Sequence, residues 1–260
     1  MRIAVLGLGE AGRRYAADLA AAGWQVAGYD PAPLAAPDGV RRAGTLAEAV
    51  GDAELVLGLT GARFAVPVAE QAAADLPAGS CFADFNSAAP AAKREVARAL
   101  ADTGAVVADV AVLAPVPRLG AATPLLACGP GADRVAAAFR AVGASVDVLA
   151  EPVGAAAGRK LLRSVFMKGL AAAVLEAVSA GAAAGCEDWV REQIAEELGE
   201  NGPALVERLI TGTKAHAARR FHEVEASRDY LAELGVRTSV CEATLEWLAE
   251  LAEQPQPIEP

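Results

Sequence analysis

The feature that most constrains the fold is a glycine-rich turn directly after the first apolar run of the chain, RIAVL. The turn consists of Gly7, Leu8, Gly9, Glu10, Ala11 and Gly12 and opens the helical sequence AGRRYAADLAAAG. In a G-x-G-x-x-G turn the first glycine permits the tight bend, the second lets a pyrophosphate approach the backbone, and the third lets the helix pack close to the strand. The amides at the helix start then face the phosphates. A turn needed only for strand–helix packing is the alternative, but strand, turn and helix together predict dinucleotide binding.

Asp30 ends the second apolar run, WQVAGYD, 18 residues after Gly12. A carboxylate at this place accepts hydrogen bonds from a ribose 2′-hydroxyl and repels a 2′-phosphate, which favours NAD over NADP. Arg41 and Arg42 follow and could hold a 2′-phosphate, so NADP stays open as the cofactor. A methyltransferase also has a Gly-rich first turn, but this glycine spacing suits a pyrophosphate better.

Strand-like and helix-like segments alternate over the first 150 residues. Several strand-like runs, such as AELVLGL, are continuously apolar, which is typical of parallel strands covered on both faces. After Pro152 the strand signal vanishes, and GAAAGRKLLRSVFMKGLAAAVLEAVSAGAAAG predicts one long helix followed by shorter ones to about Leu251. We therefore predict an α/β fold, with an N-terminal Rossmann doubly wound sheet (1–151) joined by the long helix to an all-helical domain (152–260) and a frayed tail, EQPQPIEP.

Ligands of such sheets lie beyond the carboxyl ends of the strands. Two strand ends, at Leu59-Thr60 and in the sequence DFNS, make Thr60 and Asn86 candidates for the nicotinamide side of the cofactor, although both residue types also occur in ordinary turns. A third end leads into a proline-rich loop, residues 113–124, that carries Arg118. An arginine there could hold a carboxylate or phosphate with two hydrogen bonds, or could simply be solvated.

The composition narrows the partners and the compartment. A net charge of −10 argues against a basic nucleic-acid-binding face. No charged-then-apolar leader precedes the first strand, and the Ala/Gly-rich run is too weakly apolar for a membrane span, so we expect a cytoplasmic protein. The four cysteines show no metal-ligand spacing, and with two histidines they predict no metal site; we expect buried free thiols.

Four motifs together resemble the β-hydroxyacid dehydrogenase and 6-phosphogluconate dehydrogenase superfamily: GLGEAG, DFNS followed by AAP, DVAVLAP and GAAAGRKLLRS. The resemblance covers nearly the whole chain and implies an oxidoreductase. It places Leu113, Ala114 and Pro115 in the substrate loop and Lys160 on the catalytic lysine of the family. Leu113 stands where the family usually has a serine that holds the substrate carboxylate, and Ser164 where it usually has an asparagine. HEV, at 222–224, replaces a common Lys-Asp-Leu.

Lys160 and Ser164 are one helical turn apart, so they share a face. We expect Lys160 to lie between the two domains, where desolvation and the neighbouring cations Arg159 and Arg163 would lower its pKa towards neutrality, as a general acid/base requires. The alternative is an ordinary solvated lysine. Ser164 would orient the substrate oxygen or the lysine.

Arg118, Lys168 and His222 are candidates for binding an anionic substrate, and Glu176 is more typical of a helix–helix contact than of a catalytic acid. The sequence thus predicts an NAD(P)-dependent oxidoreductase, with NAD preferred, acting on a C–O bond of a small anionic hydroxy or keto compound. An imine (C=N) reductase on the same fold and a non-catalytic NAD(P)-sensing protein are the alternatives. We also expect a homodimer through the helical domain, which looks too small to cover its own apolar surface.

Overall fold

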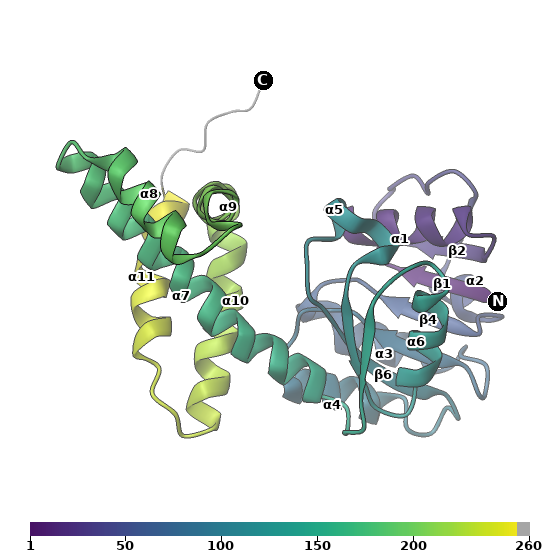
Figure 1. Cartoon of the computed structure of the whole chain (residues 1–260). Helices are drawn as coiled ribbons and strands as arrows, with labels where there is room; N and C mark the ends of the chain where they lie inside the picture. The colour runs from purple at the N-terminus through teal and green to yellow at the C-terminus, as the bar shows by residue number, and fades with distance from the viewer. Residues whose placement is uncertain (254–260) are drawn as a thin grey trace. The chain divides into compact units, whose positions relative to one another are not determined.

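The computed structural model describes residues 1–253, which form two compact units, Met1–Lys160 and the residues from Leu161 onward (Figure 1). The first unit is an α/β sheet domain and the second is helical, which confirms the predicted fold class. The long helix α7 (Ala155–Ala183) begins in the first unit, so its first residues belong with the sheet and not with the helical domain. Most of the predicted frayed tail lies outside the described residues.

An eight-stranded sheet forms the centre of the first unit, in the order β3-β2-β1-β4-β5-β6-β7-β8. The strands are β1 (Arg2–Leu6), β2 (Gln25–Tyr29), β3 (Val40–Arg42), β4 (Leu55–Gly58), β5 (Cys81–Asp84), β6 (Val106–Val112), β7 (Leu125–Cys128) and β8 (Val146–Leu149). The chain proceeds from β1 to β2 and β3 on one side and then continues with β4 on the other side of β1. Doubly wound sheets bind ligands at this switch between β1 and β4. Leu6, Gly58, Asp84 and Asp109 are register partners across β1, β4, β5 and β6, so the segments that follow them emerge at one edge.

Two strands differ from the sequence prediction. β3 was missed because it has only three residues, VRR, and two of them are charged. β7 runs antiparallel to β6, whereas its apolar character suggested a parallel strand. The connection between β6 and β7 is a short return that holds α5 (Val116–Leu119) and η2 (Gly120–Ala122), and a parallel crossover generally needs a full helix.

Helices cover both faces of the sheet (Figure 1). Side chains of α1 and α6, including Tyr15 and Phe139, pack on one face, and those of α2, α3 and α4, including Val96, pack on the other. The bounds are α1 (Glu10–Ala21), α2 (Leu46–Val50), η1 (Ala62–Phe64), α3 (Ala65–Ala72), α4 (Pro90–Ala99) and α6 (Ala132–Arg140). The central strands β4 and β5 are buried at every residue, which explains their continuous apolar runs.

The second unit contains the rest of α7 and the helices α8 (Glu187–Glu197), α9 (Gly202–Ala215), α10 (Ala217–Glu233) and α11 (Ser239–Glu253). The predicted helix breaks at 199–203 and Gly235 are confirmed. Glu176 of α7 accepts a hydrogen bond from the indole Nε1 of Trp247 at 3.2 Å, so it is a helix–helix partner as expected. The expectation of buried thiols is wrong for Cys186, which is exposed at the turn before α8; the other three cysteines are buried.

By length and composition alone, α7 could cross a membrane, since its most apolar window has a mean hydropathy of 1.5. A buried helix of a soluble protein meets the same criterion, so this property does not distinguish between the two.

Candidate functional site

The glycine-rich turn has the backbone geometry that its sequence predicts. Gly7 has a φ of 96°, and a Cβ there would lie 2.5 Å from the carbonyl oxygen of Leu59. A Cβ on Gly12 would lie 1.8 Å from the carbonyl oxygen of Gly7, so any side chain there would separate α1 from the turn. Gly9, by contrast, faces open space and precedes α1 without a side-chain cap. The backbone amides at the start of α1 therefore have no side-chain cap, and the open space beside Gly9 leaves room for an anion to accept hydrogen bonds from them.

Asp30 holds this turn in place. Its Oδ2 accepts a hydrogen bond from the backbone amide of Leu8 at 2.8 Å, and its Oδ1 accepts one from the amide of Ala32 at 2.9 Å. A carboxylate has about four acceptor sites, so it can accept further donors. Its side chain therefore orders the turn and stays able to receive a hydroxyl.

The two arginines after Asp30 bind backbone carbonyl groups. The Arg42 guanidinium donates to the carbonyl oxygens of Asp30 and Leu34, among others, and lies 5.7 Å from the ring centre of Tyr29. Arg41 donates to the carbonyl oxygen of Glu48 at 3.2 Å. Donors committed to main-chain oxygens are less available for a 2′-phosphate.

Thr60 and Asn86 follow β4 and β5 at the same edge, as predicted, but their surroundings differ. Asn86 accepts a hydrogen bond from the Gly61 amide at 2.7 Å and donates to Asp84 at 2.7 Å, so both ends of its amide are engaged. The Thr60 hydroxyl is buried and has no hydrogen-bond partner within the described structure. A buried hydroxyl without a hydrogen-bond partner costs free energy, so Thr60 is more available than Asn86 to bind a ligand.

The loop at residues 113–124 is bound to α1, because the Ala121 amide donates to Asp18 at 2.8 Å. The two ends of the loop are also joined, since the amide of Leu113 donates to the carbonyl oxygen of Pro124 at 3.0 Å. Leu113 and Ala114 are half-buried, while Pro115 and Arg118 are exposed. An exposed Arg118 could meet an anion, although no contact in the structure assigns it that role.

Lys160 lies in the second turn of α7, and its Nζ donates a hydrogen bond to Ser87 Oγ at 2.6 Å. Ser87 belongs to the DFNS sequence, in which the position after the strand end pointed to Asn86 and not to Ser87. The Arg159 guanidinium donates two hydrogen bonds, 2.6 and 3.0 Å long, to the Glu151 carboxylate, so its positive charge is paired with a negative one. The small residues Ala156, Ala157 and Gly158 before Lys160 are buried, which holds this part of α7 against the sheet domain.

The remaining predicted residues lie in the second unit. Ser164 is one turn after Lys160 on α7 and is half-buried. Lys168 forms an ion pair with Glu223 of α10, with 3.0 Å between Nζ and Oε2. The His222 side chain is 78% exposed, and its Nδ1 lies 3.5 Å from Glu225. Among residues 1–253 no three His, Cys, Asp or Glu side chains come together as a metal site would require.

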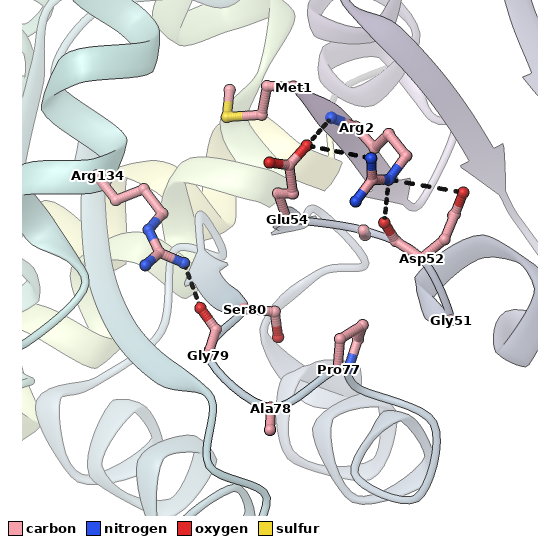
Figure 2. A pocket seen from close by; sticks show the side chains of 11 residues that line it. Met1, Arg2, Gly51, Asp52, Glu54, Pro77, Ala78, Gly79, Ser80 and Arg134 are labelled. Carbon is pink, nitrogen blue, oxygen red and sulfur yellow. Dashed lines mark hydrogen bonds and ion pairs between the residues drawn. The ribbon is translucent and has the colours of Figure 1, made fainter.

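A separate depression lies at the opposite, amino edge of the sheet (Figure 2). It encloses about 660 Å³ and contains none of the predicted site residues. Its charged groups already have partners: the Arg2 guanidinium lies 3.8 Å from both Asp52 and Glu54, and Arg134 donates to the Gly79 carbonyl oxygen at 2.6 Å. Glu54 also accepts the Arg2 backbone amide at 2.7 Å, which lowers the pKa of its carboxyl. This pairing and the distance from the carboxyl strand ends give no reason to place the chemistry here.

Known proteins are similar to this chain in sequence and in fold. The family model described as the NAD binding domain of 6-phosphogluconate dehydrogenase matches residues 2–150, and a domain of unknown function matches residues 182–251. An uncharacterized 28.5 kDa protein of Methanothermus fervidus is 26% identical over 143 residues, which is 55% of each of the two chains. The match thus spans about half the length of that relative.

Solved structures match over almost the full length of both chains. A conserved hypothetical protein from Sinorhizobium meliloti is 28% identical, with a TM-score of 0.78 over 100% of this chain and 91% of that one. A Mycobacterium tuberculosis 3-hydroxyisobutyrate dehydrogenase, solved with L-serine, has a TM-score of 0.83 at 20% identity and covers 98% and 94%. An imine reductase of Streptomyces aurantiacus has a TM-score of 0.63 at 24% identity and covers 96% and 94%. The fold is therefore shared by hydroxyacid dehydrogenases and imine reductases.

The family match over more than half of the chain agrees with the glycine turn and the strand order of the first unit. The chain belongs to the family that carries the NAD-binding domain of 6-phosphogluconate dehydrogenase.

Proposed function

We propose that the protein is an NAD(P)-dependent oxidoreductase that acts on the C–O bond of a small anionic hydroxy or keto compound, with Lys160 as its general acid/base. The observation that carries this proposal is the hydrogen bond between Lys160 Nζ and Ser87 Oγ. Ser87 follows β5 at the carboxyl edge, where the glycine-rich turn also emerges from β1. An amine fixed by a partner at this edge is suited to proton transfer, whereas a solvated surface lysine is not.

The residues present fit a dinucleotide. The open space beside Gly9, the uncapped start of α1 and the orphaned hydroxyl of Thr60 are all features that such a ligand would complete. The cofactor supplies the hydride chemistry, and the protein supplies binding, orientation and proton transfer. In the oxidation, neutral Lys160 takes the hydroxyl proton of the substrate; in the reduction, its ammonium donates that proton to the carbonyl oxygen. Ser87 holds the amine. The role that we propose for Ser164, one helical turn after Lys160, is to orient the amine or the substrate oxygen.

We propose NAD as the preferred cofactor. Asp30 can accept a ribose hydroxyl and repel a phosphate, while Arg41 and Arg42 already donate to carbonyl oxygens. These main-chain contacts leave fewer arginine donors for the 2′-phosphate of NADP.

A C=N reductase is the second candidate, because Leu113 places an apolar side chain where relatives that bind hydroxyacids usually have a serine. With no hydroxyl to hold a carboxylate, the loop is less suited to a hydroxyacid than to a neutral imine. Among the carriers of this fold, imine reductases are represented. A binding protein that senses NAD(P) without turnover is the third outcome of the test below.

We further propose a cytoplasmic homodimer that associates through the helical unit. Phe166, Trp189 and Val240 in this unit are 67%, 62% and 59% exposed, and large apolar side chains with such exposure are typical of surfaces that meet a partner. The exposed thiol of Cys186 suits a reducing compartment.

One experiment separates the three functions. The purified full chain is mixed with reduced or oxidised NAD or NADP and a panel of hydroxyacids, keto acids and cyclic imines, and the absorbance of the reduced nicotinamide is followed through a single turnover. Oxidation of hydroxyacids, or reduction of keto acids, supports the dehydrogenase. Turnover of imines alone supports the second candidate. Tight cofactor binding without any turnover over the whole panel supports the sensor and refutes the proposed catalysis.

A further inference from the structure

A buried ionic cluster in the first unit joins α4 to β5 and β6. Lys93 of α4 is 1% exposed, and its Nζ lies 3.2 Å from Asp84 Oδ2 and 3.3 Å from Asp109 Oδ1. The same ammonium donates a hydrogen bond to the carbonyl oxygen of Asp84 at 2.7 Å, while its contacts with the two carboxylate oxygens are ion pairs without hydrogen-bond geometry. The two carboxylates are equally buried, at 1% and 0% exposed. Charged side chains are rarely buried to this extent unless they are paired, and this cluster contains one cation and two anions.

The surplus negative charge is met by the start of α7. Asp109 Oδ2 accepts hydrogen bonds from the backbone amides of Gly154 at 3.1 Å and Ala157 at 3.0 Å. Unpaired amides and the positive end of the helix dipole favour an anion at this position. Asp109 thus caps α7 from a strand that lies far away in the sequence, and it fixes where the helix begins.

The start of α7 also packs on α4, the helix that carries Lys93. Gly154 has a φ of 104°, and a Cβ there would lie 3.1 Å from the carbonyl oxygen of Pro90. A side chain at residue 154 would crowd that carbonyl group and strain the backbone, so the glycine lets the residue before α7 lie close to α4. Strand β6, helix α4 and the start of α7 are held together around the Lys93 ammonium.

Each of the two carboxylates holds one of the segments that form the Lys160–Ser87 contact. Asp84 Oδ1 accepts the backbone amide of Asn86 at 2.9 Å and its side-chain amide at 2.7 Å, which orders the turn that ends at Ser87. Asp109 holds the amide of Ala157, and Lys160 follows three residues later, about 4.5 Å along the helix. Lys93 is the one group that contacts both carboxylates through ion pairs within the described residues.

We propose that Lys93 is a positioning residue: by bridging Asp84 and Asp109 it holds the Ser87 turn and the start of α7 in the relative placement that brings Lys160 Nζ onto Ser87 Oγ. The consequence for turnover rests on the proposed function of Lys160. The consequence for the placement of Lys160 does not, because it can be measured without substrate.

Three variants test this role. Lys93→Met removes the cation and changes the formal charge of the cluster from −1 to −2. The double variant Lys93→Met/Asp84→Asn returns the charge to −1 and keeps an Oδ1 acceptor for the amides of Asn86. Arg98→Met is the matched control, since it removes a cation from the same helix at a side chain that is 73% exposed.

Lysine labelling with acetic anhydride, quantified by peptide mass spectrometry, reports on the placement of Lys160. The chain has only four lysines, so Lys168 and Lys214 serve as internal references in each sample. Far-UV circular dichroism and the Kd for NADH establish that each variant keeps its fold.

In Lys93→Met the two facing carboxylates lose the cation that lies between them, and their mutual repulsion should move them apart and displace Lys160 from Ser87. We expect relative labelling of Lys160 to rise several-fold in Lys93→Met and to stay near wild type in the double variant and in Arg98→Met.

If the protein is an enzyme, kcat of Lys93→Met should fall by about 10- to 100-fold, as for small misplacements of catalytic groups, while the Kd for NADH stays unchanged. Unaltered labelling of Lys160 in a folded Lys93→Met would overturn the proposal whether or not the protein has activity. Altered labelling without any activity in the wild type would support the positioning role and count only against the proposed function. Should Lys93→Met fail to fold, Asp109→Asn replaces it: raised Lys160 labelling supports the proposal, and labelling like wild type refutes it.

Discussion

Replacing Asp30 by alanine should weaken the binding of NAD more than that of NADP and should also loosen the glycine-rich turn. Asp30 accepts two backbone hydrogen bonds, from Leu8 at 2.8 Å and from Ala32 at 2.9 Å. The first of them joins the end of β2 to the middle of the turn. Alanine leaves both amides without this acceptor and removes the negative charge beside the proposed ribose site.

Both effects can be given a magnitude. A hydrogen bond to a charged group is worth about 1.5–3 kcal/mol, but Asp30 is only half-buried and water can replace it in part, so we expect a loss of about 1–3 kcal/mol in the free energy of unfolding. For a chain of this size that is a fall in Tm of about 2–4 °C for each kcal/mol. The loss of one charge-assisted bond to a ribose hydroxyl should raise the Kd for NAD by about 10- to 100-fold. The Kd for NADP should change much less, because the repelling charge disappears together with the ordered turn.

Calorimetric titration of wild type, Asp30→Ala and Asp38→Ala with both dinucleotides provides the test. Asp38 is exposed and lies in the same connection after β2, so its variant removes an equal charge from the same region without touching the turn. Equal losses of affinity for NAD and NADP would show that Asp30 acts only through the turn. Tighter binding of NADP than of NAD by the wild type would refute the assigned preference outright.

Three further predictions concern other parts of the chain. Lys160→Ala should lower kcat by about 100-fold or more with an unchanged Kd for NADH, as measured by steady-state kinetics and titration, and full activity would remove Lys160 from the mechanism. Burial raises the pKa of the Cys81 thiol from 9.0 to about 12, so above pH 9 the unfolded chain loses a proton that the folded chain keeps, and stability falls as pH rises. Between about pH 8 and about pH 10 the wild type should lose roughly 1.4 kcal/mol more than Cys81→Ala in denaturant unfolding, and an equal loss in both would contradict the assigned burial effect. Light scattering at micromolar concentration should give the mass of a dimer, and a monomer would contradict the proposed association of the helical units.

The sheet domain was predictable because its signals are local. A glycine that must adopt a φ of 96° and a glycine whose Cβ would lie 1.8 Å from a carbonyl oxygen can be recognised from spacing alone, since few other turns need both. Apolar runs covered on both faces likewise identify buried strands. The charged strand β3 and the reversed direction of β7 were not predictable in this way, because their places depend on strand neighbours and on a short connection that leaves no room for a crossover.

The residues of the candidate site likewise fall into those that local motifs indicate and those that only the folded structure brings together. Lys160 and Asp30 could be selected from motifs, but the sequence gives no indication that Ser87 is the partner of Lys160, 73 residues away. Lys93 had one local signal, which is its position on the apolar face of α4 with Pro90 and Val96.

The sequence by itself determined the glycine turn, the order of strands and helices along the chain, and the residue types available for proton transfer, because each of these follows from neighbouring residues. Only the tertiary structure decided which charges meet. Asp84, Lys93 and Asp109 come from two strands and a helix, and their pairing depends on the register of β5 with β6 and on the packing of α4 over both. Water is excluded from these charges only once the chain has folded, and desolvation makes their pairing decisive.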